Sequence, residues 1–351
     1  MLTITLRDIQ WRARRFALGA VATALVFAAT LLLAGLHASF LNESTQTVAS
    51  FTAGRWIVPA GVTGPFTQNV PLSAQQQAEV QRGLAGATPV VISAVVMRAA
   101  GQDYSADLIG YQPGGGFSPH ITAGRAPRAA DEVATDQLLH LPIGSVTTID
   151  GRRWRVVGSV AGLTYNVGTP ALLMTLQAAR RLVFGGQQQA SAMITRTVPR
   201  NLPTGLRAMT NAQVLSDLRR PLSTATSAIE VLAVLLFVVA IGVIGLMVYL
   251  SSLDRMPEFA VYKAVGVSDG ILLGSLILQT MAFALVAAVL AVAAAALMAP
   301  HFPIPVSIGL GLYVALFGAA FLVGLAASVV GIRQVTRVDP AAAFAGRGAQ
   351  A

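Results

Sequence analysis

The chain has 351 residues, of which 54% are hydrophobic and only 11% are charged, and its mean hydropathy is +0.66. This composition excludes an ordinary soluble domain and indicates a membrane protein. Cysteine is absent, which excludes disulfides and thiolate sites, and the net charge of +9 comes without the basic and aromatic clusters of nucleic-acid-binding proteins.

The N-terminal segment 1–15 is the first predicted element. Apolar residues recur there at spacings of three and four, with arginines on another face. This pattern predicts an amphipathic helix in the cytoplasmic membrane interface, and a plain positively charged flank is the alternative.

Four apolar runs are long enough to cross a bilayer, which takes about 20 residues. They cover 16–40, 226–250, 271–299 and 307–332. The first run is too long for the apolar core of a cleaved signal peptide, the competing interpretation. The predicted fold class is therefore an α-helical membrane protein with four transmembrane helices plus a mixed α+β extracytoplasmic domain, residues 41–225, between helices 1 and 2.

The charge distribution predicts the orientation. Arginines or lysine precede the first run, occupy the loop 251–270 and follow the last run in the tail 333–351, whereas the loop 300–306 has neither. Short loops rich in these residues stay on the cytoplasmic side. Both termini and the loop 251–270 are therefore expected in the cytoplasm, and 300–306 is a short outer loop.

The domain 41–225 shows both strand and helix signals. Asp150-Gly151 between two β-prone segments predicts a hairpin, and "TPVVISAVVM" and "SAMITR" have strand composition. "TLQAARRLVFGG" predicts a helix closed by Gly185, and "NAQVLSDLRR" predicts another that starts at Asn211.

Two features of the apolar runs concern helix ends and helix packing. Ser227 and Glu230 fit a capping box at the outer end of the second spanning helix. The segment after Pro221 has few helix breakers, so this helix is also expected to begin early and to project above the membrane. Small residues at helical spacing predict close helix packing in the second and fourth runs, at Gly242, Gly245, Ala320, Gly324 and Ser328.

The sequence offers no site for chemistry. Lys263 is the only lysine and follows Tyr262, so there is no phosphate-binding Gly-Lys-Ser/Thr loop, and the glycine-rich stretch 110–120 is expected to be an ordinary loop. The four histidines are scattered, and no nucleophile motif is present. We therefore expect no catalytic, cofactor-binding or metal site in this chain, and an external source of energy.

The loop 251–270 is more elaborate than a connector requires. A proline and an acid suit the first turn of a short helix, a glycine suits its end, and two aromatic residues three apart share a face with flanking charges. Such a helix rests on lipid headgroups or docks into a partner. The residues concerned are Pro257, Glu258, Phe259, Tyr262, Lys263 and Gly266.

The segment "EFAVYKAVGVSDGILLGSLILQ" resembles the signature of FtsX-like permeases, the membrane subunits of MacB-type (type VII) ABC transporters. Gln279 falls where that family often has Glu or Gln. The tail resembles the family's closing pattern at Arg337, Asp339, Pro340 and Ala343, and residues 123–162 are similar to the family's core periplasmic domain. Alanines replace expected glycines at 291 and 293–296, and MacB's fused ATPase is absent.

The resemblance implies a homodimer in a bacterial inner (plasma) membrane, bound to two copies of a separate P-loop ATPase that holds ATP and Mg. Residues 257–265 would form the coupling helix, with Phe259 and Tyr262 as anchors and Glu258 and Lys263 as polar contacts. The second span would transmit ATPase motion to the outer domain, that is, by mechanotransmission.

The expected outcome of that motion is export of a substrate or its extraction from the cell envelope, with an extracytoplasmic accessory protein as a further partner. The alternative is an FtsX-like regulator that pulls on a cell-wall hydrolase. A third hypothesis is a membrane-tethered sensor without a motor, which would purify without an ATPase.

Overall fold

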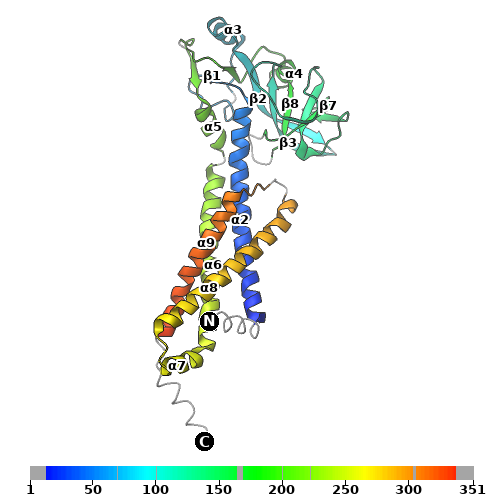
Figure 1. Cartoon of the computed structure of the whole chain (residues 1–351). Coiled ribbons are helices and arrows are strands. Elements are labelled where there is room, and N and C mark those ends of the chain that lie inside the picture. Colours follow the sequence, from blue (N-terminus) through cyan, green and yellow to red (C-terminus); the bar gives the residue numbers. More distant parts are fainter. Residues whose placement is uncertain are drawn as a thin grey trace. The chain divides into compact units, whose positions relative to one another are not determined.

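The computed structural model describes residues 13–68, 70–99, 101–163, 169–199, 201–221, 223–302 and 306–336 (Figure 1). The chain divides into two compact units. The span unit comprises Met1–Ser39 and Thr226–Ala351, and the inserted domain comprises Phe40–Ala225. Most of the predicted N-terminal amphipathic helix, and the tail pattern at Arg337, Asp339, Pro340 and Ala343, lie outside the described residues.

Four helices in the described part of the chain are long and apolar enough to cross a membrane. The candidate spans Ala17–Ser50, Thr226–Asp254, Gly270–His301 and Leu310–Val329 lie on α2 (Ala13–Ser50), α6 (Ser223–Asp254), α8 (Asp269–Met298) with the short η2 (Ala299–His301), and α9 (Leu310–Thr336). Together with the mixed domain between the first two of them, they give the predicted fold class.

The end of α2 and the cap of α6 differ from the sequence expectation. The first helix continues past residue 40 to Ser50, because 41–50 is polar but contains no glycine or proline to stop it. The early start of the second spanning helix is confirmed, because α6 begins at Ser223. The predicted capping box is wrong, because Ser227 then lies inside the helix. An N-cap residue needs non-helical backbone angles, which an interior residue cannot have.

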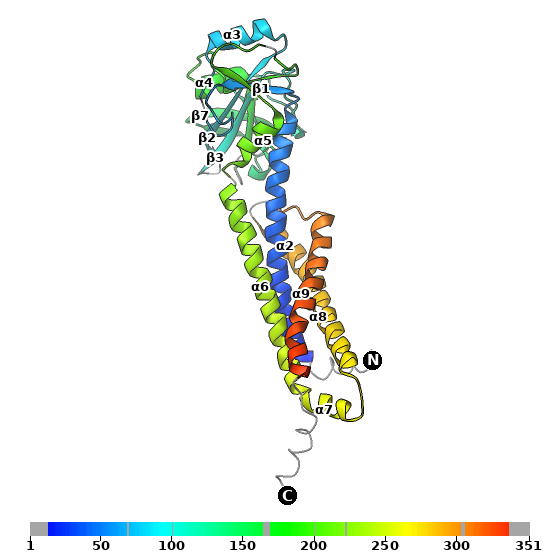
Figure 2. The same ribbon diagram turned by 90° about the vertical axis from the view of Figure 1, so that its left-hand side faces the viewer.

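Small residues bring the helices of the span unit close together. α8 and α9 lie side by side in both views (Figure 2). Ala320 and Ser328 are buried, and a Cβ on Gly324 would lie 3.2 Å from Met281 Cα of α8. The three predicted small residues of the fourth run thus form one surface against α8.

The first helix also has close contacts within the span unit. A Cβ at Gly35 would lie only 2.7 Å from Val306 Cγ1, and the Ser307 amide donates a 2.7 Å hydrogen bond to Ser39 Oγ. The glycine therefore admits the segment that leads into α9, and the serine fixes it.

The inserted domain is built on a mixed sheet. In the part of the chain that the structure describes, the sheet has ten strands. Nine of them follow the order β10-β1-β9-β2-β3-β8-β5-β7-β4, and β6 lies off this path and pairs with β2 and β7. The pairs β3–β8 and β5–β7 are parallel and the others antiparallel. The strands are β1 (Arg55–Pro59), β2 (Thr88–Ala99), β3 (Gln102–Tyr111), β4 (Ile121–Gly124), β5 (Glu132–Asp136), β6 (Val146–Ile149), β7 (Arg152–Val160), β8 (Ala171–Thr175), β9 (Ala192–Thr195) and β10 (Leu206–Met209).

Short helices complete the domain: α3 (Ala74–Gly83), the 3₁₀ turn η1 (Gln137–Leu139), α4 (Leu176–Val183) and α5 (Asn211–Arg219). α5 starts at Asn211 as predicted, but its cap is the preceding residue, since Thr210 and Gln213 form a capping box. The predicted closure of α4 by glycine is confirmed, because Gly185 has a φ of 61° just beyond the helix end.

The predicted hairpin joins β6 to β7. Ile149 pairs with Arg152, and the two residues between them, Asp150 and Gly151, have φ angles of 45° and 76°. Positive φ at both central residues defines the type I′ turn, whose twist matches that of the strands. The Asp150 carboxylate also accepts a 3.1 Å hydrogen bond from the Val96 amide, which ties the turn to β2.

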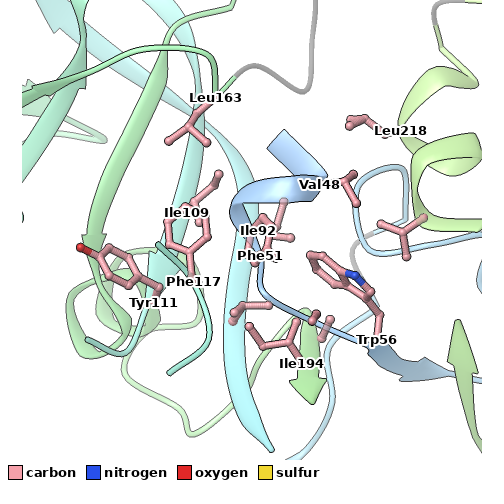
Figure 3. Packing of buried hydrophobic residues seen from close by; sticks show 14 of the residues in the cluster. Val48, Phe51, Trp56, Ile92, Ile109, Tyr111, Phe117, Leu163, Ile194 and Leu218 are labelled. Carbon is pink, nitrogen blue, oxygen red and sulfur yellow. The ribbon is translucent and has the colours of Figure 1, made fainter. Parts of the chain in front are cut away.

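The core of the domain surrounds the end of α2 (Figure 3). Val48 of α2 and Phe51 just after it belong to this core, and the Phe51 ring lies 4.6 Å from that of Trp56 and 4.4 Å from that of Phe117. Arg219 of α5 also donates a 3.0 Å hydrogen bond to the Leu41 carbonyl of α2. The last turns of α2 are therefore an integral part of the inserted domain.

Candidate functional site

The candidate site is α7 (Met256–Ala264), the short helix between α6 and α8. Pro257 lies in its first turn, where its fixed φ suits a helix. The N–H groups of a first turn have no partner within the helix, so the missing N–H of proline costs no hydrogen bond. Glu258 is the acid of the same turn and faces the positive end of the helix dipole. Local sequence thus determines where the helix starts.

Gly266 ends the helix in a Schellman motif. Its φ is +91°, its amide donates 3.0 Å to the Lys263 carbonyl, and the Val267 amide donates 3.0 Å to the Tyr262 carbonyl. The left-handed conformation satisfies carbonyls that would otherwise lack partners at the helix end. Ser268 follows as the first residue beyond the turn and precedes α8 without a side-chain capping bond.

The two faces of α7 have opposite environments. Phe259 and Ala260 are 7% and 3% exposed and belong to the hydrophobic core of the span unit. Val261, Tyr262 and Val265 are 55%, 40% and 79% exposed. The sequence interpretation put Phe259 on the partner-facing side with Tyr262. This is wrong for Phe259, because its ring is buried in the hydrophobic core of the span unit.

Arg255 is the site residue that sequence reasoning missed, since it was interpreted only as a topology signal. Its side chain is 12% exposed, and its Nη1 donates a 3.1 Å hydrogen bond to Gln279 Oε1 of α8. Its Nε lies 3.6 Å from Glu258 Oε2, whose side chain is 51% exposed. The sequence signal was present in part, because Gln279 falls where FtsX-like permeases often have Glu or Gln.

The glycines of α6 differ from the small residues of α9. Gly242 is exposed with nothing within 4 Å of a Cβ built on it, whereas Gly245 is buried. The predicted helix packing at Gly242 therefore has no counterpart within the described residues of this chain.

The carboxylate of Glu132 in the inserted domain has a strongly lowered pKa. Glu132 is buried, and its oxygens accept 2.8 and 2.5 Å hydrogen bonds from Arg125 and bonds from the amides of Arg128 and Ala129. The Arg125 bond, followed by the two amides, lowers the pKa of Glu132 to about 2 against the opposing effect of burial. This is a structural clamp at the start of β5, because a strongly stabilised carboxylate is a poor proton donor.

The glycine-rich stretch forms a loop, as expected from the sequence. Gly114, Gly115 and Gly116 border a cavity of about 370 Å³ together with Thr52 and Arg196. The carbonyl of Gly116 accepts hydrogen bonds from both the amide and the hydroxyl of Thr52, so the loop is tied to the segment after α2. Among the described residues, no group of three or more His, Asp or Glu side chains could hold a metal ion.

Comparison with known proteins identifies the family. Residues 230–340, which include α7, match the C-terminal domain of FtsX-like permeases. The chain is 38% identical over 348 residues to the ABC transporter permease Rv2563 of Mycobacterium tuberculosis (strain H37Rv), which covers 99% of this chain and 100% of that protein. The chain belongs to the FtsX-like ABC transporter permeases. The permease is also 36% identical over 348 residues, with the same coverage, to Rv0072 of that organism.

More distant similarities extend the comparison. The permease is 19% identical over 357 residues to a putative hemin transport system permease, HrtB, of Staphylococcus haemolyticus, covering 98% of this chain and 99% of that protein. The extracellular domain of the ABC-type transporter YknZ from Gram-positive bacteria aligns with a TM-score of 0.33 and 11% identity, covering 45% of this chain and 99% of that domain. The MacB-type assignment from the sequence is consistent with the FtsX-like family match and with the full-length permease relatives.

Proposed function

We propose that this permease couples ATP hydrolysis, carried out by a separate P-loop ATPase that docks on α7, to movement of the inserted domain. The observation that carries the proposal is the two-faced environment of α7. One face is buried in the span unit, and the other exposes Val261, Tyr262 and Val265. An apolar helix face that stays exposed between two spans is a surface for a partner, and membership of the ABC permeases makes an ATPase the partner.

The proposed orientation follows from the basic residues near the spans. Both termini and α7 face the cytoplasm of a bacterial cell, and the inserted domain lies outside the plasma membrane. The ATPase, which binds ATP and Mg, works from the cytoplasmic side. A homodimer of this chain with two ATPase copies then gives each α7 one partner.

In the proposed mechanism, ATP binding brings the two ATPases together and moves the two α7 helices with them. The motion passes along the chain through α6, and through α2, whose end is part of the domain core at Val48 and Phe51. An arrangement of this kind requires no polar path through the spans. We propose that the movement exports a substrate or extracts it from the cell envelope, with an accessory protein outside the membrane.

The experiment is recovery of the ATPase with the tagged full-length permease from native membranes. Tyr262→Ala with Val265→Ala removes two exposed side chains, one on α7 and one at the residue that caps its end. The matched control, Tyr104→Ala with Val198→Ala, removes the same residue types from the inserted domain, where they are 36% and 63% exposed. We expect the α7 variant to retain at most about a tenth of the ATPase, since aromatic anchors at interfaces are often worth 2 kcal/mol or more.

Mass spectrometry identifies the recovered protein by its Gly-Lys-Ser/Thr loop. Equal recovery of the ATPase with both variants would overturn the docking role of α7. Labelling of α7 residues by a reagent added outside intact cells would overturn it as well. Recovery of a cell-wall hydrolase together with the ATPase would replace transport by regulation as the purpose of the movement. The permease purified alone is expected to hydrolyse no ATP.

A further inference from the structure

Arg255 lies at the junction of α6 and α7 with its charge almost fully removed from water. Its side chain is 12% exposed, and the Gln279 side chain that accepts its hydrogen bond belongs to a residue that is 9% exposed. A buried guanidinium is costly unless its donors are satisfied. The contact with Gln279 is therefore one that the folded chain is strongly driven to keep.

The position of Gln279 within α8 shows which part of that helix is connected to α7. Gln279 is ten residues beyond Asp269, the first residue of the helix, which corresponds to about 15 Å along its axis. Arg255 thus connects the start of α7 to the interior of α8. The end of α7 is connected to the start of α8 through the chain itself, by the turn at Gly266 and Ser268.

α7 is consequently attached to α8 at both ends. It also contributes Phe259 to the hydrophobic cluster that contains Leu272 and Leu276 of α8. Rotation or withdrawal of α7 relative to α8 would break the charged hydrogen bond and uncover the phenylalanine. The described geometry favours joint movement of α7 and the first turns of α8.

We propose that Arg255 is a positioning residue that transmits displacement of α7 to α8 through Gln279. This adds a second output to the movement, beside the path along α6, and it rests on the proposed docking of an ATPase on α7. Arg255 acts by holding α7 and α8 as one body while the ATPase pulls on the exposed face of α7.

The test compares Arg255→Leu, Gln279→Leu, the double variant and Gln279→Glu, with Ser251→Ala as the control. Ser251 borders the same small cavity as Gln279 and Thr280 but is not part of the contact. Gln279→Glu keeps an acceptor for the guanidinium, and it remains informative if a leucine variant fails to fold. Hydrogen exchange is measured in the full chain in lipid nanodiscs, first alone and then with the ATPase and a non-hydrolysable ATP analogue.

In the chain alone, we expect residues 256–264 to exchange at least about tenfold faster in either leucine variant, since hydrogen bonds to charged groups are the stronger ones. The double variant should exchange no faster than the singles, because all three lack the same interaction. Gln279→Glu and Ser251→Ala should behave like the wild type. Wild-type exchange in the leucine variants, or additive effects in the double variant, would overturn the proposal.

In the assembled complex, the ATPase should still bind the leucine variants, because the exposed face of α7 is unchanged. The change in α8 exchange that the nucleotide produces in the wild type should be lost in them and retained in Gln279→Glu. A full α8 response in the leucine variants would refute the positioning role. If the wild-type chain binds no ATPase, the proposed function fails instead, and exchange in the chain alone still decides whether Arg255 holds α7 against α8.

Discussion

Gly266 offers a direct test of how α7 is terminated. Its φ is +91°, and a Cβ built on it meets nothing within 4 Å, so Gly266→Ala adds no steric clash. The cost is that of an L-residue in the left-handed region, about 1–2 kcal/mol. Because 1.4 kcal/mol corresponds to a factor of ten, opening of the last turn should become about 5 to 30 times more frequent.

Hydrogen exchange of the amides in 256–267 measures this opening in the full chain. Gly270→Ala is the matched control, because its Cβ also meets nothing within 4 Å but the residue lies in α8 without a positive φ. Alanine in a helix is favoured over glycine by about 1 kcal/mol, so this variant should slow local exchange. Slower exchange in both variants, or no change in Gly266→Ala, would refute the assignment of Gly266 as the obligatory helix terminator.

Three further predictions concern stability. At pH values above its ordinary pKa of 4.5, the Glu132 carboxylate contributes its full stabilisation, and this is lost as the pH falls toward its lowered pKa of about 2. Glu132→Gln should therefore make the unfolding free energy of the domain depend less on pH in this acid range, as followed by tryptophan fluorescence. Asn211→Leu should lower the unfolding free energy of the domain by about 2 kcal/mol in denaturant titrations, because the Trp56 Nε1–H and a backbone carbonyl lose their partner; a change under about 0.5 kcal/mol would contradict this. Gly324→Leu should destabilise the span unit by about 1–3 kcal/mol by separating α9 from α8, whereas Gly318→Leu, with open space around its Cβ, should not; equal thermal stabilities in nanodiscs would argue against this contact.

The sequence predicted elements whose signals are local. Asp150-Gly151 determines a hairpin because few other residues adopt positive φ at two successive positions. The bounds of α7 followed from a proline and a glycine for the same reason. Long apolar runs identify spans because the bilayer sets their length, irrespective of how they pack.

Features that depend on packing were not predictable in this way. Phe259 and Tyr262 are three residues apart, about 60° around a helix, so periodicity puts them on one face, but the boundary between buried and exposed sides passes between them. Nothing in the local sequence says where α6 and α8 lie around α7. The contact of Arg255 with Gln279 joins positions 24 apart and is beyond any periodicity argument.

The end of α2 and the cap of α6 were predicted less well. Hydropathy shows where apolar sequence stops, and at residue 40 this was mistaken for the end of the helix, although α2 continues to Ser50. Ser227 and Glu230 have the capping spacing, but α6 begins earlier, at Ser223. A capping motif is decisive only where the preceding residue cannot be helical, and no such residue stands directly before Ser227.

The burial of Phe259 removes one anchor from the proposed interface. It also fixes α7 against the span unit, which makes the helix a firmer attachment point for the proposed ATPase. A helix resting on lipid headgroups would turn its apolar residues to the bilayer and would need no core of its own. Here Phe259 and Ala260 fix one face, and the Arg255 contact fixes the start of the helix, so Tyr262 and Val265 are held in place before any partner arrives. Pre-organised side chains lose less entropy on binding, and a rigid attachment passes displacement on without first being deformed. The two properties that the proposed coupling helix needs thus arise from Phe259, which the sequence interpretation assigned to the partner, and from Arg255, which it used only for topology.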